Sequence, residues 1–266
     1  KLNETMLIPT YHKISPKRIL LVGLGKPELF LLDKIRQAFG TASRVMQTKR
    51  ISSFSIFLGT YNDASIEDSV RSIVEGVLLS LYNFTRYKNL EKEEKCDVSS
   101  FSLLTGDKSI LDTVKATAKS AQTIAEAVCF TRDIVNMSGS DATPTFLANK
   151  AREIAKQSDI KCTILSKPDL KKIGMGGILS VSRGSSEEPK FIILEHKTPK
   201  KGSETVVIIG KGVTFDSGGL CLKPGKDMDL MKGDMSGGAA ILGTFMALSH
   251  LKPSVNVVGL IPCTEN

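Results

Sequence analysis

The sequence predicts an α/β protein in which an N-terminal α/β domain is joined by a long helix to a C-terminal αβα domain with a mixed, mostly parallel sheet. Short apolar runs rich in Val and Ile alternate with amphipathic stretches, an order typical of βαβ units. Residues 111–136 are Ala-rich, contain neither Gly nor Pro, and are long enough to link two domains. The length of 266 residues suits one large or two ordinary domains.

Residues 1–110 are predicted to form the first domain. Its expected elements, in chain order, are a strand at 18–24, a helix at 28–47, a strand at 51–59, a helix at 66–82 and a strand at 98–104, which together indicate a mostly parallel sheet with covering helices. Gly23 and Gly25 follow the first strand, as in a dinucleotide-binding loop, but Glu28 occupies the place of the third glycine. We therefore interpret this stretch as a tight strand-to-helix turn.

Residues 111–136 are the predicted linking helix and residues 137–266 the second domain. The expected elements of that domain are a helix at 145–157, a strand at 161–165, a short helix at 167–173, strands at 174–182, 190–196 and 205–209, a helix at 237–250 and a strand at 256–261.

The loop that follows the strand at 205–209 carries the candidate site. Two lysines and two aspartates, Lys211, Asp216, Lys223 and Asp234, lie among glycines that allow tight folding. Ligands of open α/β sheets bind beyond the carboxyl ends of strands, which is where this loop begins. Carboxylates suit divalent cations, whereas a lysine binds a metal only when its amine is neutral. A solvated ion pair between Lys211 and Asp216 is the alternative that the residues leave open.

The motifs GKGVTFDSGGLCLKP and MDLMKGDMSGGAA in this loop resemble the signature of the leucyl aminopeptidase (cytosol aminopeptidase) family of two-metal peptidases. Segments 75–88, 132–151 and 175–196 also resemble that family, so the resemblance covers most of the chain. It implies release of N-terminal residues, preferably leucine and other bulky apolar ones, from peptide substrates by water activated between two divalent ions, Zn or Mn with Mg as a further option. It also implies a homohexamer.

The resemblance assigns a role to each residue of the loop. Lys211 and Asp234 would bind one metal ion and Asp216 would bridge both. Lys223 would remain charged as the catalytic residue that holds the substrate carbonyl oxygen. Met231 would line the pocket for the first side chain of the peptide, so that all five residues contribute to substrate binding.

The resemblance is incomplete at both ends. The family motif Asn-Thr-Asp-Ala-Glu-Gly-Arg, which completes the metal shells, does not occur in residues 1–266. Three ligands cannot fill the shells of two divalent ions. We therefore expect a fragment that is inactive alone, with the first strands missing from 1–110 and only the first part of the catalytic domain in 137–266.

The net charge is +8, but the basic residues are dispersed and mixed with acidic ones. Some members of the family also bind DNA, so DNA binding and a catalytically silent scaffold role of the oligomer are the alternative functions. Nucleic acid is a permitted but not a favoured partner. Titration with duplex DNA at two salt concentrations tests the DNA-binding alternative, because phosphate-dominated affinity falls steeply with salt. Mass spectrometry of the native protein tests the scaffold alternative by showing whether the chain extends past Asn266.

The sequence also predicts a cytoplasmic location. No apolar run approaches the length of about 18 residues that a membrane helix needs. The cysteines are five in number, widely spaced and without a CxxC pair, which indicates free thiols in a reducing compartment (Cys96, Cys129, Cys162, Cys221 and Cys263). The three histidines show no metal-ligand spacing. Thr264, Glu265 and Asn266 follow the last strand and can point toward the same edge as the site loop, where Glu265 is either an extra carboxylate or, as we expect, a loop residue that satisfies backbone amides.

Overall fold

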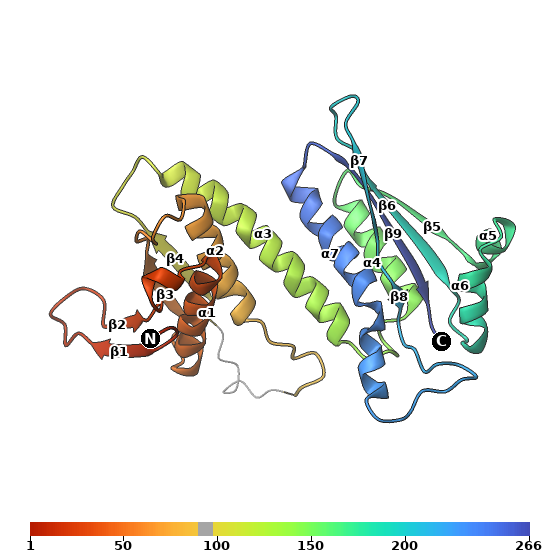
Figure 1. Cartoon of the computed structure of the whole chain (residues 1–266), viewed down its shortest axis with the longest axis horizontal. Coiled ribbons are helices and arrows are strands. Elements are labelled where there is room, and N and C mark those ends of the chain that lie inside the picture. Colours follow the sequence, from red (N-terminus) through yellow and green to blue (C-terminus); the bar gives the residue numbers. More distant parts are fainter. Residues whose placement is uncertain (90–97) are drawn as a thin grey trace. The chain divides into compact units, whose positions relative to one another are not determined.

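The structure is a computed structural model that describes residues 1–89 and 98–266 (Figure 1). The insertion at 89–97 and Cys96 therefore lie largely outside the described residues. The chain divides into two compact units, Lys1–Glu126 and Ala127–Asn266. This division falls within helix α3 (Leu111–Asn136), the predicted linking helix. The finer domain boundaries at 110/111 and 136/137 stay a prediction.

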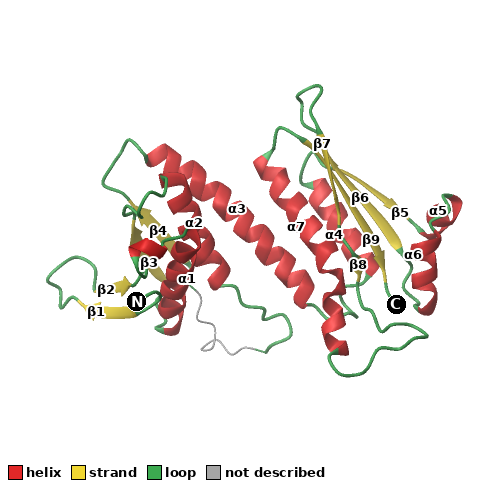
Figure 2. Cartoon of the chain, viewed as in Figure 1, coloured by secondary structure: helices red, strands yellow, loops and turns green. Residues whose placement is uncertain are grey.

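The N-terminal unit contains two small sheets and two packed helices (Figure 2). Strands β3 (Ser53–Phe57) and β4 (Ser100–Leu104) pair in parallel, as expected. Helices α1 (Leu32–Thr48) and α2 (Ile66–Ser80) confirm the two predicted helices. Helix α1 begins later than predicted, because Pro27–Leu29 forms a separate 3-10 turn, η1.

The prediction of a single sheet in this unit is wrong, because the first predicted strand belongs to a separate sheet. Strand β2 (Arg18–Val22) pairs antiparallel with β1 (Thr5–Pro9) and joins neither β3 nor β4. The turn between them is closed by the amide of Thr10, which donates to the carbonyl oxygen of Lys17 at 3.1 Å. The run TMLIP was overlooked because it is short and ends in a proline, which weakens a strand pattern.

Helices α1 and α2 pack at unusually close range. A Cβ atom at Gly76 would lie 2.5 Å from the carbonyl oxygen of Arg36, so only glycine permits this approach. Ile35, Ile73 and Val77 are fully buried in the core beneath the two helices. The Nε atom of Arg36 also forms an ion pair with Oε2 of Glu75 at 2.7 Å across the helix contact.

The C-terminal unit confirms the predicted mixed, mostly parallel sheet. Its five strands are β5 (Lys161–Leu165), β6 (Lys190–His196), β7 (Thr205–Ile209), β8 (Gly212–Val213) and β9 (Asn256–Thr264). Their order is β5-β6-β9-β7, with β8 continuing along β9 beyond β7. Strand β6 is antiparallel to its neighbours β5 and β9, so it alone runs opposite to the other four.

Two helices, α4 (Pro144–Lys156) and α7 (Ser236–Leu251), cover one face of this sheet (Figure 1). Their core is apolar, and Leu147, Leu194 and Phe245 are fully buried in it. A Cβ atom at Gly259 would collide with the ring of Phe245, so the glycine lets α7 lie close to β9. Among the described residues, no helix is both long and apolar enough to cross a membrane.

The predicted strand at 174–182 is wrong. These residues form helix α6 (Gly176–Val181) and the 3-10 turn η2 (Ser182–Gly184), after the short helix α5 (Lys167–Lys172). Gly174 adopts a φ of +74°, which ends α5 and reverses the chain before α6 starts. A short apolar run such as GGILSV has no periodicity that separates a strand from a helix.

Candidate active site

The predicted site loop leaves the sheet where parallel strands β7 and β9 run side by side. A Cβ atom at Gly210 would collide with the backbone of Gly237 at the start of α7, so glycine allows β7 to end directly against that helix. Strand β8 then pairs with Cys263 and Thr264 of β9. The 3-10 segment η3 (Met228–Met235) leads into α7 and carries Met231 and Asp234. Both aspartates and both lysines therefore come to one edge of the sheet.

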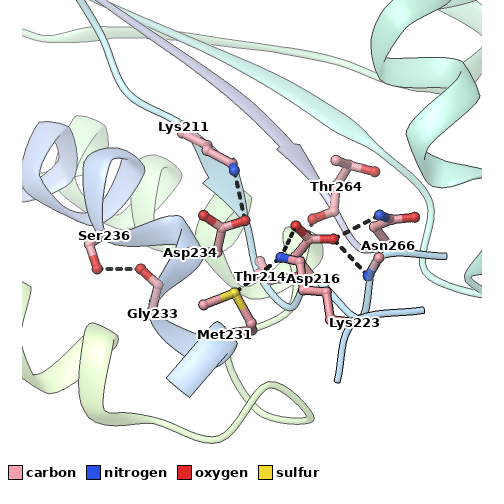
Figure 3. A network of polar contacts seen from close by, with 11 residues as sticks. Lys211, Thr214, Asp216, Lys223, Met231, Gly233, Asp234, Ser236, Thr264 and Asn266 are labelled. Atoms are coloured by element: carbon pink, nitrogen blue, oxygen red, sulfur yellow. Dashed lines mark hydrogen bonds and ion pairs between the residues drawn. The ribbon is translucent and has the colours of Figure 1, made fainter. Parts of the chain in front are cut away.

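Lys211 and Asp234 form the first ion pair of the site (Figure 3). The Nζ atom of Lys211 lies 2.8 Å from Oδ2 of Asp234. The lysine side chain is 59% exposed, whereas that of the aspartate is 18% exposed. Although the distance suits an ion pair, the two groups are not aligned for a hydrogen bond, and Oδ2 is buried without a hydrogen-bond donor. Its charged partner is Nζ of Lys211.

Lys223 and Asp216 form the second ion pair, with 2.5 Å between Nζ and Oδ2. The same Nζ atom lies 3.1 Å from Sδ of Met231, which ties this pair to η3. Oδ1 of Asp216 accepts from the amide of Gly218 at 3.1 Å and from Nδ2 of Asn266 at 2.7 Å. The alternative pairing of Lys211 with Asp216 is thus wrong, because Lys211 pairs with Asp234 and Lys223 pairs with Asp216.

The surroundings of Asp216 lower the pKa of its carboxyl group. The hydrogen bond from Lys223 is the largest cause. Partial burial acts in the opposite direction, while hydrogen bonds from Asn266 and Gly218 and the charge of Lys223 lower the pKa further. Asp216 is therefore ionised at neutral pH and can serve as an anionic ligand.

The arrangement fits part of a metal site. Two carboxylates and an amine are donors that divalent cations accept, and the buried Oδ2 of Asp234 lacks a hydrogen-bond donor. In the described ranges 1–89 and 98–266, no three His, Cys, Asp or Glu side chains gather into a group that could hold a metal ion. The chemistry of Lys211, Asp216 and Asp234 is therefore compatible with part of a metal shell.

The other residues considered from the sequence have ordinary surroundings. Glu265 accepts a hydrogen bond from the hydroxyl of Ser185 at 2.6 Å and not from backbone amides, which corrects its expected role. Cys221 is exposed and Cys263 is buried, and burial raises the pKa of the Cys263 thiol. Asn266, which the sequence places after the last strand and near the same edge of the sheet, contacts Asp216 there.

Fold and site together define an α/β protein with a charged cluster at the carboxyl ends of neighbouring parallel strands. The profile described as "Cytosol aminopeptidase family, catalytic domain" matches residues 129–266, and that of the family's N-terminal domain matches residues 1–90. The chain belongs to the cytosol aminopeptidase family.

Related proteins support this assignment. A probable cytosol aminopeptidase of Geotalea uraniireducens is 42% identical over 100% of this chain and 54% of its own length. A probable cytosol aminopeptidase of Alkaliphilus metalliredigens is 36% identical over 99% of this chain and 53% of its own length. The chain thus spans about half the length of the curated relatives that it matches.

Solved structures resemble the fold over the whole chain. The bottromycin maturation enzyme BotP in complex with Mn has a TM-score of 0.87 at 28% identity, covering 100% of this chain and 54% of its own. A mutant of tomato leucine aminopeptidase has a TM-score of 0.84 at 28% identity, with coverage of 100% and 50%.

Proposed function

We propose that the protein is a metal-dependent aminopeptidase that hydrolyses the N-terminal residue from peptides. The observation that carries this proposal is the convergence of two Lys–Asp pairs at one sheet edge in a chain of the cytosol aminopeptidase family. The Mn complex of BotP, a similar structure, supports metal dependence. A preference for leucine and other bulky apolar residues is part of the proposal, as is the use of two ions of Zn, Mn or Mg.

The proposal gives the residues of the site different roles in binding metal and substrate. Asp216, Asp234 and Lys211 would hold the metal, with Lys211 as a neutral amine. When bound, the metal supplies Lewis-acid polarisation and an activated water. Lys223 would donate from Nζ to the substrate carbonyl oxygen as negative charge develops there, an effect worth about 10²- to 10³-fold in rate. Met231, which lies against Nζ of Lys223, would contact the first side chain of the peptide.

The remaining ligands would come from sequence that this chain does not contain. Two divalent ions need more ligands than three side chains and water provide. We therefore propose that residues 1–266 alone are inactive and that activity requires a protein of the family's full length. A homohexamer and a cytoplasmic location also belong to this proposal, while the DNA-binding and scaffold alternatives stay untested.

Hydrolysis of leucine p-nitroanilide by the protein at the full length of its relatives tests the proposal. A chelator should abolish the activity, and Zn²⁺ or Mn²⁺ should restore it. Residues 1–266 expressed alone should show no turnover. Turnover that is insensitive to chelation would rule out the metallopeptidase mechanism, and full activity of residues 1–266 would rule out the need for further ligands.

A further inference from the structure

Asn266 extends the sheet past its last strand. Its backbone amide donates to the carbonyl oxygen of Phe215 at 3.0 Å, and its own carbonyl oxygen accepts from the amide of Ser217 at 2.8 Å. The hydroxyl of Ser217 donates to the same carbonyl oxygen at 2.9 Å. The backbone of Asn266 thus forms hydrogen bonds with the residues on both sides of Asp216. These bonds continue the parallel ladder between β8 and β9.

The side chain of Asn266 forms a hydrogen bond with the carboxylate of Asp216 itself (Figure 3). Nδ2 donates to Oδ1 of the carboxylate at 2.7 Å, while Lys223 occupies Oδ2. The two oxygens of Asp216 therefore have separate partners. Gly219 has a φ of +66°, and a Cβ atom there would lie 2.7 Å from Oδ1 of Asn266. The loop can close over the amide only because this position is glycine.

The chemistry of an amide suits this place. A carboxylate is free to rotate about its Cβ–Cγ bond unless hydrogen bonds fix its plane, and an amide fixes it without adding a charge. A neutral donor on Oδ1 does not compete with a cation for the carboxylate as a second lysine would. In metal sites, partners of this kind orient the ligand and typically affect metal affinity or activity about 10- to 100-fold.

We propose that Asn266 is a positioning residue that holds the carboxylate of Asp216 in the orientation needed to bind metal. This inference rests on the proposed function, because it assumes that Asp216 is a metal ligand. Asn266 acts through Asp216 and not on the substrate. Its neighbour Glu265 instead accepts a hydrogen bond from the hydroxyl of Ser185, so the two residues after β9 separate the effect on the ligand from general anchoring of the chain.

The test replaces Asn266 by leucine in the protein at the full length of its relatives. Asn266→Leu keeps the size and the backbone bonds but removes the donor, and Glu265→Gln is the matched control. Isothermal titration of the metal-free proteins with Mn²⁺ and Zn²⁺ gives the Kd, and thermal unfolding of the metal-free proteins reports any structural damage. Should the leucine variant fail to fold, Asn266→Ser is the second variant. Its shorter polar side chain does not extend to Oδ1 of Asp216 as the amide does, and it introduces no apolar group.

We expect the Kd for metal to rise about 10- to 100-fold in Asn266→Leu and less than threefold in Glu265→Gln, with similar metal-free melting temperatures. Unchanged metal affinity in Asn266→Leu would overturn the inference and leave the proposed function standing. An equal loss in Glu265→Gln would overturn it as well, since anchoring would then explain the effect. If the wild-type protein bound no metal, both the inference and the proposed function would fall.

Discussion

Two ion pairs, one in each unit, are nearly alike in geometry but differ in their surroundings. Arg36 and Glu75 are 2.7 Å apart with side chains 33% and 13% exposed, and Lys223 and Asp216 are 2.5 Å apart with side chains 36% and 17% exposed. The first pair joins two rigid helices over a glycine contact. The second lies on a glycine-rich loop, where Asp216 has further donors and the nearby Asp234 has a buried oxygen without one.

The distance and exposure of an ion pair therefore do not reveal its role. A partly exposed pair contributes about 0 to 1 kcal/mol to stability wherever it occurs. The hydrogen bonds to Asp216 and the nearby second Lys–Asp pair distinguish the surroundings of the second ion pair from those of the first. Four experiments test whether the two ion pairs differ in role.

The largest effect is expected for Asp216→Asn. The variant keeps the shape of the side chain but removes an anionic metal ligand and the partner of Lys223, so kcat/KM should fall by about 10³-fold or more, which corresponds to about 4 kcal/mol. Glu75→Gln, which breaks the ion pair of the other unit, should leave kcat/KM within about threefold. The measurement is peptidase activity together with metal content. Near-normal activity of Asp216→Asn would remove the distinction between the two pairs.

Lys223→Met is expected to have the next largest effect. Loss of the cationic donor should lower kcat by about 10²- to 10³-fold. Metal content should stay unchanged, because Lys223 is not a proposed ligand. Arg36→Met is the matched control and should retain full activity, with a loss of stability of at most about 1 kcal/mol. A similar drop in activity for both variants would mean that Lys223 acts only through folding.

Replacing a tightly packed glycine should lower stability in either unit. Only the replacement in the C-terminal unit, at Gly210, should also affect metal binding. A Cβ atom at Gly210 or Gly76 would meet backbone atoms, so either alanine variant should lose about 1–3 kcal/mol of stability in denaturant titrations. Gly210→Ala should also disturb Lys211 and reduce metal affinity, whereas folded Gly76→Ala should bind metal normally. Gly225→Ala has no atom within 4 Å of the new Cβ and should be neutral in both measurements.

The smallest expected effect is a pH dependence of stability. The depressed pKa of Asp216 means that its interaction with Lys223 stabilises the metal-free protein fully above the unfolded pKa, about 3.9 for Asp. This contribution is lost as the pH falls through the lower, folded pKa. Denaturant titrations between pH 6 and pH 3 should therefore show a shallower acid loss for Asp216→Asn than for the wild type. Parallel acid losses would contradict the proposed lowering of the pKa.

Much of the fold could be predicted from local pattern. The run at 205–209 and the long stretch at 111–136 have the composition of a buried strand and of a helix, and both are confirmed. The stretch at 174–182 could not be assigned, because its apolar residues suit either element until Gly174 reverses the chain. Strand β1 needs its pairing partner β2 to exist, since five residues ending in proline carry little propensity of their own.

The residues of the site could also be predicted in part from the sequence, whereas their contacts could not. Its resemblance to a known motif identified Lys211, Asp216, Lys223, Met231 and Asp234, and family membership is now established. Their individual roles in catalysis stay predictions. The sequence did not show which lysine meets which aspartate, because Asp216 and Lys223 are brought together by a loop with two left-handed glycines. It placed Asn266 only near the same edge and did not show its contact with Asp216, from which η3, α7 and β9 separate it along the chain.

By itself, the amino-acid sequence determined the alternation of strands and helices, the chemical groups of the site and the family of the protein. These properties depend on residue type and spacing within short stretches. Only the tertiary structure decided the strand order, the pairing of the charges, the buried oxygen of Asp234 and the contact of Asn266 with Asp216. The contact of Asn266 with Asp216 depends on the parallel alignment of β8 and β9, which brings together residues some fifty positions apart, whereas the pairing of Lys223 with Asp216 depends on the glycine-rich loop.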